Sequence, residues 1–144
     1  MKKMILATLV LGLLFLQGCS SLSLQEKQTI RSFQANGISV DHPAGLWEKP
    51  ASPLGAGLLN ILPGCGNFYL ACGDGADNDH WLYGALNLLF WPLSITWGIP
   101  EAVVDAGNIN ERELIYFYTF DAAGEQALAD RGLQLNNRGQ IEKK

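Results

Sequence analysis

The sequence predicts a mainly α protein, with two apolar helical segments packed as a broken hairpin and a small C-terminal α/β element. Residues 50–73 and 81–100 carry no charge, and each stretch is close to the roughly 20 residues that cross a bilayer. Each stretch is nevertheless interrupted by a proline, Pro63 and Pro92. Residues 108–144 combine an aromatic run with turn-forming residues, which is typical of a small mixed element.

The N-terminus has the layout of a secretory signal. Lys2 and Lys3 precede an uncharged apolar run over residues 4–16, and the run ends in the sequence LQGC. This tetrapeptide resembles the lipobox of bacterial lipoproteins. The resemblance implies removal of residues 1–18, a diacylglycerol on the sulfur of Cys19, and an acylated (for example palmitoylated) new N-terminus. The alternative is an ordinary signal peptide with a chance cysteine.

The resemblance also implies where the protein resides. Three acyl chains anchor a protein firmly, whereas one chain gives only marginal binding. Ser20 follows Cys19, and in enterobacteria-like lipoproteins it is an aspartate at this position that favours retention at the inner membrane. We therefore expect a periplasm-facing anchor in the outer membrane, with the outer leaflet of the inner membrane as the alternative.

The composition of the processed chain excludes one class of partner. Removing 18 of 144 residues leaves 126, with 8 basic and 14 acidic residues and a net charge of −6. No Lys or Arg occurs between Lys49 and Arg112. Nucleic-acid binding needs basic residues to neutralise phosphates, so we expect no nucleic-acid partner.

Residues 19–53 are expected to form a lipidated N-terminus, a short helix and a tether. Ser23 and Glu26 have the spacing of a capping box, and Asn36-Gly37 ends the helix near Ala35. Prolines and glycines over residues 38–53 predict an extended connection. Trp47 within it is a candidate for a membrane interface.

Residues 54–107 form the predicted apolar hairpin region, and its topology argues against two spanning helices. With the anchor in the periplasm, a two-pass hairpin would place the acidic loop DGADNDH in the cytoplasm, where loops are usually rich in Lys and Arg. Pro63 would end the first helix after about 13 Å, less than half a hydrocarbon core. The interruptions fit helices that pack together, enter one leaflet, or form a buried core.

An internal echo supports mutual packing of the two segments. Gly57 and Asn60 recur as Gly84 and Asn87 in the shared pattern G-x-L-N-[IL]-L. Small residues let helices approach closely, and an asparagine on an apolar face needs a hydrogen-bond partner. We expect both asparagines to satisfy polar groups across the hairpin; the alternative is coincidence in a Leu-rich sequence.

Residues 108–144 are expected to form a polar periplasmic segment. Before it, Pro100 is expected to begin a new helix that ends at Gly107. Residues 113–120 suit either a strand or a continuing helix, and residues 123–130 a short helix. Residues 133–141 resemble a small hairpin around Asn136 to Gly139.

The stretches LPGCGNFYLACG and WLYGALNLLFWPLSITWGIPEAVVDA resemble the TM2 family and uncharacterised bacterial lipoproteins. In this chain Ala71 stands where the family usually has glycine, and Asn67 precedes the phenylalanine. The resemblance implies two helices around a short loop in a membrane-associated, non-catalytic module. Its matching positions are Gly64, Gly66, Phe68, Tyr69, Leu70 and Asp105.

Chemical sites find little support in the sequence. Glu101 and Asp105 lie four residues apart on one helical face, which suits a cation or acid–base pair but more often a solvated face. Cys65 and Cys72 are interpreted as two small buried thiols, with a disulfide as the alternative. The sequence contains no zinc-binding, nucleophile or phosphate-binding motif.

The acidic loop (Asp74, Asp77, Asp79) lacks the spacing of an EF-hand calcium site, and His42 and His80 form no HxxxH pattern. We predict no catalytic residue, metal or cofactor.

Two functions from different classes remain. The first is a small lipid-anchored envelope lipoprotein with a structural or scaffolding role, membrane-apposed and possessing no enzymatic activity. Its partners would be membrane lipid through Cys19 and an envelope protein complex. The second is a periplasmic binding module whose Gly/aromatic region forms a pocket for an apolar ligand or lipid. A hydrolase using Glu101 and Asp105 is the least supported reading.

Overall fold

The computed structural model describes residues 21–73 and 78–144, and this part of the chain is mainly helical with one small sheet. The predicted fold class is confirmed. The elements are α2 (Leu24–Ala35), α3 (Pro53–Leu59), α4 (Cys65–Ala71), α5 (Asp79–Leu89), α6 (Ile95–Phe120), α7 (Ala122–Ala129), β1 (Leu133–Leu135) and β2 (Ile141–Lys143).

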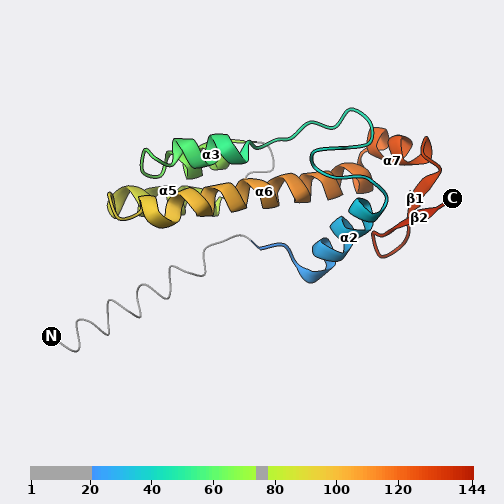
Figure 1. Ribbon diagram of the computed structural model, residues 1–144, viewed down its shortest axis with the longest axis horizontal. Coiled ribbons are helices and arrows are strands. Elements are labelled where there is room, and N and C mark those ends of the chain that lie inside the picture. The colour runs from blue at the N-terminus through green and yellow to red at the C-terminus, as the bar shows by residue number, and fades with distance from the viewer. Residues whose placement is uncertain (1–20, 74–77) are drawn as a thin grey trace.

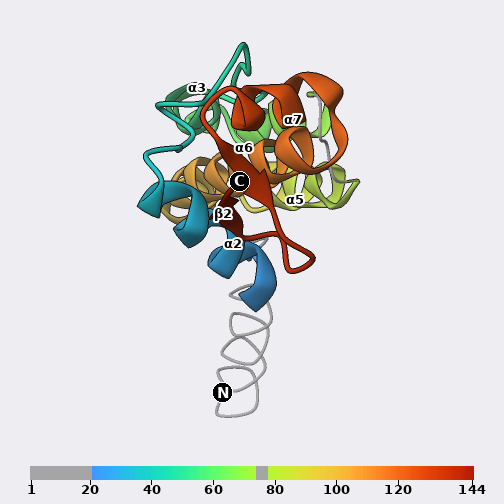
Figure 2. The ribbon, with the colours of Figure 1, turned by 90° about the vertical axis from the view of Figure 1, so that its right-hand side faces the viewer.

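Helix α6 forms the long axis of the molecule (Figure 1). Helix α3 packs along its first half, and α4 contacts α3, α5 and α6. Helix α5 reaches α6 through side-chain contacts, His80 with Asp105 and Asn87 with Trp97. The second half of α6 carries α2, α7 and the two-stranded sheet, which Figure 2 shows gathered around that end. The two halves of α6 therefore have different surroundings.

The start of the described chain follows the sequence-based expectation. Ser23 caps α2, and its hydroxyl accepts from the Glu26 N–H at 3.2 Å while Glu26 Oε2 accepts from the Ser23 N–H at 2.6 Å. This reciprocal pair is the predicted capping box.

The segment after α2 has no regular structure, but it is packed rather than loose. Ile38, Ala44 and Ala51 are buried, and Trp47 packs against the core. The Tyr118 hydroxyl donates to the Ala44 carbonyl at 2.9 Å and accepts from its N–H at 2.6 Å. The expected tether is thus held along the protein, and Trp47 lies against the interior.

Each apolar segment is divided into two helices by a turn. Residues 60–64 separate α3 from α4, and residues 90–94 separate α5 from α6. Gly64 has φ +79°, a left-handed conformation that favours glycine. Trp91–Pro92 is a cis peptide in the second turn. The broken hairpin therefore consists of two helical pairs.

The expected helix start at Pro100 and stop at Gly107 were wrong. Helix α6 begins at Ile95, contains Pro100, and continues without a break to Phe120. Pro100 lies in the second turn, where it removes only one helical hydrogen bond, and α3 packs alongside. Gly107 keeps a negative φ. Residues 113–120 belong to the same helix. Helix α6 therefore runs through the boundary between the predicted hairpin region (residues 54–107) and the predicted polar segment (residues 108–144).

The C-terminal elements form where the sequence predicts them. Asp121 caps α7 through the Ala123 N–H at 2.8 Å. Leu135 pairs with Ile141 in an antiparallel hairpin, and Asn136 and Gly139 frame its turn. The core at this end is apolar and consists of Ile30, Phe33, Ile38, Ala44, Leu114, Tyr118, Leu128 and Leu133.

Candidate functional site

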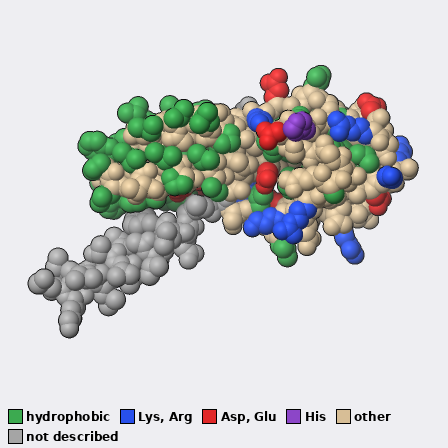
Figure 3. Space-filling model, in the orientation of Figure 1, with side chains coloured by type: hydrophobic (Ala, Val, Ile, Leu, Met, Phe, Trp, Pro, Cys, Tyr) green, Lys and Arg blue, Asp and Glu red, His purple; other side chains and the backbone are tan. Residues whose placement is uncertain are grey.

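The two ends of the molecule differ in where they place apolar and polar side chains. We call residues 53–73 and 78–104 the apolar lobe, and residues 21–52 and 105–144 the charged head. On the face that Figure 3 shows, hydrophobic side chains gather at the lobe end and most charged side chains lie at the head end. The lobe contains no Lys or Arg, and its described acidic residues are Asp79 and Glu101.

The surface of the apolar lobe is unusually apolar. The lobe supplies 14 of the 18 large hydrophobic side chains that are exposed in the described chain. Monomers in water seldom expose a contiguous apolar patch of this kind without a binding role. The 14 residues are Leu54, Leu58, Leu59, Ile61, Leu62, Trp81, Leu82, Leu88, Leu89, Trp91, Leu93, Trp97, Val103 and Val104.

The interior of the lobe is correspondingly polar. Of eight buried polar or charged residues, five lie in the lobe and two, Asp105 and Asn110, lie on α6 just beyond it. The buried hydrophobic residues of the lobe are Ala56, Leu70 and Ala102, whereas the head buries twelve. The lobe therefore has the inverse of the usual polarity. Its five buried polar residues are Asn60, Asn67, His80, Asn87 and Ser94.

Asn60 and Asn87 meet at one point on α6. The Asn60 side chain donates to the Gly98 carbonyl and accepts from the Gly66 N–H at 3.2 Å. Asn87 accepts from the Trp97 indole N–H at 2.8 Å. A Cβ on Gly98 would lie 2.7 Å from the amide nitrogen of Asn60 and 3.0 Å from that of Asn87. The sequence analysis did not single out Gly98 as a contact point for the two asparagines. The only hint in the sequence is a glycine between two large apolar residues, Trp97 and Ile99.

The paired glycines permit close helix approach. A Cβ on Gly57 of α3 would press on Val103 and Ile99 of α6. A Cβ on Gly84 of α5 would press on the Phe68 ring of α4, and one on Gly64 would fall well inside contact with the Gly84 carbonyl. Both glycines of the echo thus lie at helix contacts.

The TM2-like positions are distributed around α4 and its neighbours. Gly64 precedes α4, and a Cβ on Gly66 would clash with the Ala56 carbonyl. Phe68 stacks on Trp81 with ring centroids 5.5 Å apart. The Tyr69 hydroxyl accepts from the Ser52 N–H at 3.1 Å, and Leu70 is buried.

Asp105, the last TM2-like position, lies beside His80. Its carboxylate Oδ2 is 4.0 Å from His80 Nδ1, and both side chains are buried. Neither ring nitrogen of His80 has a hydrogen-bond partner among the described residues. Sequence reasoning had set His80 aside because it belongs to no ligand pattern, and only the antiparallel packing of α5 on α6 joins residues 80 and 105.

Glu101 shares this face of α6. Burial, and then the charge of Asp105, raise the pKa of Glu101, while the nearby Asn87 side chain acts in the opposite direction. A half-buried carboxyl with a raised pKa is suited to holding a proton. In residues 21–73 and 78–144, no group of three His, Cys, Asp or Glu side chains is arranged to hold a metal ion.

The cysteines and the acidic loop add no site. Cys65 and Cys72 are both free thiols, so the disulfide alternative is wrong in this structure. The expected burial is wrong too, because Cys65 is half-buried and Cys72 is exposed. Asp74 and Asp77 lie outside the described residues, and so does Cys19.

Helix α6 provides a scale for the depth of the lobe. Asn60 and Asn87 lie level with Gly98, His80 with Asp105, and Ala51 with Asn110. Ten residues separate Ile95 from Asp105, or about 15 Å along the helix. That is half of a hydrocarbon core about 30 Å thick. The described part of the chain has no helix with both the length and the hydropathy to cross a bilayer.

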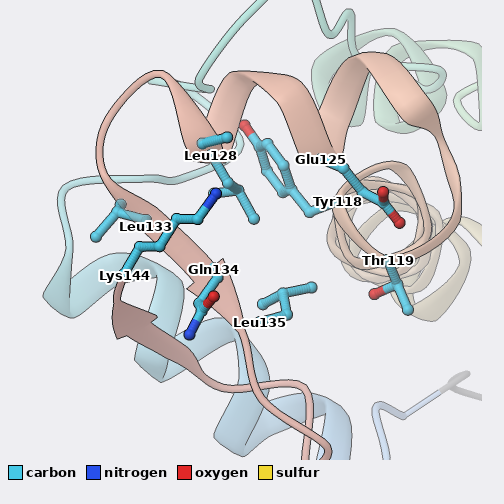
Figure 4. A pocket seen from close by; sticks show the side chains of 9 residues that line it. Tyr118, Thr119, Glu125, Leu128, Leu133, Gln134, Leu135 and Lys144 are labelled. Atoms are coloured by element: carbon cyan, nitrogen blue, oxygen red, sulfur yellow. The ribbon is translucent and has the colours of Figure 1, made fainter.

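The charged head has a cavity of its own. Its volume is about 340 Å³, and it lies between the end of α6, α7 and β1 (Figure 4). Leu128, Leu133 and Leu135 supply apolar walls, and Glu125 and Lys144 supply charge. A cavity of this size is at the lower end of those that hold small molecules.

Comparison with known proteins finds no matching family model, curated protein or solved structure.

Proposed function

We propose that the protein is a small lipid-anchored envelope lipoprotein whose apolar lobe enters one leaflet of the membrane, where it has a structural or scaffolding role without catalysis. The anchor is the lipidated Cys19. The membrane is the outer membrane, with the outer leaflet of the inner membrane as the alternative. The observation that carries the proposal is the inverted polarity of the apolar lobe.

Lipid is the surrounding in which this polarity is favourable. Exposing Leu, Ile and Trp side chains costs free energy in water but not in hydrocarbon. Asn60 and Asn87 meanwhile find hydrogen-bond partners inside the lobe. A fully buried Leu side chain gains about 1.5–3 kcal/mol over an exposed one, so several such side chains provide firm attachment.

The depth of the lobe and the placing of its turns support insertion into one leaflet. The turns at residues 60–64 and 90–94 lie at the far tip, since Asn60 is level with Gly98 near the start of α6. Both turns are uncharged and apolar. Asp79, at the start of α5, lies at the opposite end of the lobe, near the head. Helical pairs that enter and leave on the same side need no charged loop in the membrane.

A scaffolding role follows from the rigid connection between lobe and head. Because α6 is continuous from Ile95 to Phe120, a lobe held in lipid would fix the height and direction of the head. The head would then present its charged surface to an envelope protein complex at a set distance from the membrane.

The test is membrane retention of the protein without its lipid. Residues 20–144 are fused to a cleavable signal that is not a lipoprotein signal, and envelopes are washed at alkaline pH. We expect the protein to stay with the membrane. The double substitution Leu62→Glu and Leu89→Glu at the tip should release it, because charge in hydrocarbon is costly.

The matched control is Leu46→Glu, since Leu46 is 97% exposed but belongs to the head. This variant should remain in the membrane as the parent does. Recovery of the parent as a soluble monomer would contradict the proposal. A soluble oligomer would mean that copies of the lobe cover one another instead.

The alternative, a periplasmic binding module for an apolar ligand or lipid, would use the cavity in Figure 4. Its three leucines and its volume are the observations that favour it. Mass spectrometry of the purified protein tests it: a co-purified lipid that is lost with Leu128→Glu would support binding. Protein free of bound lipid would count against this alternative.

A further inference from the structure

The first described residues are fastened to the middle of α6. Arg112 Nη2 donates to the Ser21 carbonyl at 3.2 Å, and Arg112 Nε lies 3.4 Å from Glu26 Oε1. Leu22, between these contacts, is 6% exposed. We call Ser21, Leu22, Glu26 and Arg112 the N-terminal clasp. Chain termini are usually poorly ordered unless contacts of this kind hold them.

Glu26 connects the clasp to α2. One carboxylate oxygen accepts from the Ser23 N–H in the capping box, and the other faces Arg112. Although burial acts in the opposite direction, hydrogen bonds with Ser23 and the charge of Arg112 hold the pKa of Glu26 below its usual value. The carboxylate is therefore ionised at neutral pH, and both contacts are retained there.

The clasp lies just beyond the base of the apolar lobe. Arg112 is seven residues after Asp105, or about 10 Å farther along α6. In Figure 1, α2 begins beside the middle of α6, on the head side of α3 and α5. Cys19 is two residues before Ser21 in the sequence, and two residues of chain span at most about 8 Å. The headgroup region is of similar thickness, about 5–8 Å on each side.

Residues 21–52 are packed on the protein, so they do not act as a flexible linker between the anchor and the lobe. A loose tether through residue 53 would let the head move freely above the membrane. Instead, Ile38, Ala44 and Ala51 are buried, and Asn110 donates to the Ala51 carbonyl at 2.8 Å. The connection between Cys19 and the folded body is thus only two residues long. A short connection also raises the effective concentration of the lobe at the membrane.

We infer that the N-terminal clasp delivers the lipidated Cys19 to the base of the apolar lobe, so that acyl chains and lobe enter the same leaflet and together set one height for the charged head. The inference rests on the proposed lipidation and lobe insertion. Arg112 is in this role a positioning residue, and the partner surface of the clasp region is the phospholipid headgroup layer.

The experiment uses the full lipidated protein in vesicles of phosphatidylethanolamine and phosphatidylglycerol. Cys65→Ser and Cys72→Ser remove the free thiols, and a nitroxide is attached through Ser21→Cys or, separately, Leu62→Cys. The Ser21 side chain is exposed and makes no clasp contact, since only its carbonyl accepts from Arg112. Electron paramagnetic resonance then reports mobility and depth at both positions.

We expect an immobilised label at headgroup depth on residue 21 and a label deep in the hydrocarbon on residue 62. Arg112→Gln should produce a mobile component at residue 21 without changing the depth at residue 62. Glu26→Gln should do the same to a lesser degree, because glutamine keeps the capping box and hence α2. The matched control Arg138→Gln removes an exposed charge of the head and should change neither label.

A mobile residue 21 label in the parent protein would overturn the inference, and so would immobility that survives both Arg112→Gln and Glu26→Gln. A residue 62 label that reports water would instead overturn the proposed lobe insertion, whatever the label on residue 21 shows. Circular dichroism of each variant verifies that the helices remain.

Discussion

The apolar lobe and the charged head are built by opposite rules within one chain. The head buries Phe33, Tyr118 and Leu114 and surrounds them with charge. The lobe buries asparagines, a histidine and a serine and turns its leucines outward. A core that is mostly polar gains little from water exclusion. The lobe is therefore held by close helix contacts, by the hydrogen bonds of Asn60 and Asn87, and by one small apolar cluster, whereas the head is held by a larger apolar core.

Truncating one large apolar side chain at each end should produce the largest difference in the free energy of unfolding between head and lobe. Phe33 is fully buried and packs edge-on to Tyr118 with centroids 5.3 Å apart. Phe33→Ala should lower the free energy of unfolding by about 3–5 kcal/mol. Leu62→Ala at the exposed tip should change it by less than about 0.5 kcal/mol. Denaturant unfolding of the anchor-free protein in mild detergent measures both, and equal effects would remove the contrast.

The lobe should be sensitive to substitutions at glycines where two helices approach closely. Gly64→Ala forces a Cβ against the Gly84 carbonyl at a positive φ, and we expect a loss of about 2–4 kcal/mol. Gly107→Ala is the matched control, because a Cβ there meets nothing within 4 Å and the position is helical. It should be neutral or stabilising by up to about 1 kcal/mol. Thermal unfolding distinguishes the two, and a tolerated Gly64→Ala would show that α4 and α5 can separate.

The buried side-chain amide of Asn60 should contribute to the stability of the lobe, although a leucine at this position would add apolar surface. Asn60→Leu removes the acceptor for the Gly66 N–H at the start of α4, and it should cost about 1–3 kcal/mol despite the added apolar surface. Asn137→Leu in the exposed hairpin turn is the control and should change stability by less than about 0.5 kcal/mol. If Asn60→Leu left unfolding unchanged, the hydrogen bond would not hold the lobe together.

The smallest expected effect is a pH dependence from the raised glutamates. Burial raises the pKa of Glu111 in the head, and burial together with Asp105 raises that of Glu101 in the lobe. The folded state then binds each proton more tightly than the unfolded chain does. Stability should therefore fall as pH rises from the usual range of a glutamate through the raised pKa, and the penalty is absent below that range.

Glu101→Gln and Glu111→Gln should each flatten this fall. The flattening should be greater for Glu101, because its variant also removes the repulsion from Asp105. Unfolding midpoints measured across mildly acidic to neutral pH provide the comparison. A profile that keeps its slope in both variants would place the pH dependence on other groups.

Local signals in the sequence predicted most single elements correctly. The Ser23 capping box, the turn around Asn136 to Gly139 and the breaks at Pro63 and Pro92 depend on a few neighbouring residues, whose preferences the sequence reveals directly. The start of α6 was wrong because Pro100 was read as a first-turn residue. Its neighbour α3 supports the helix on both sides of the proline, and that support comes from residues some forty positions away.

The mainly α class, the two divided apolar segments, and the absence of Lys and Arg between Lys49 and Arg112 follow from the sequence alone. The sides of those segments that face outward depend on how the helices pack in the folded chain. That packing brought Asn60 and Asn87 to Gly98, His80 to Asp105, and Ser21 to Arg112. The physical reason is that composition sets how much apolar surface a chain has, whereas the packing of antiparallel helices decides which part of it is buried and which part is left for a surrounding other than water.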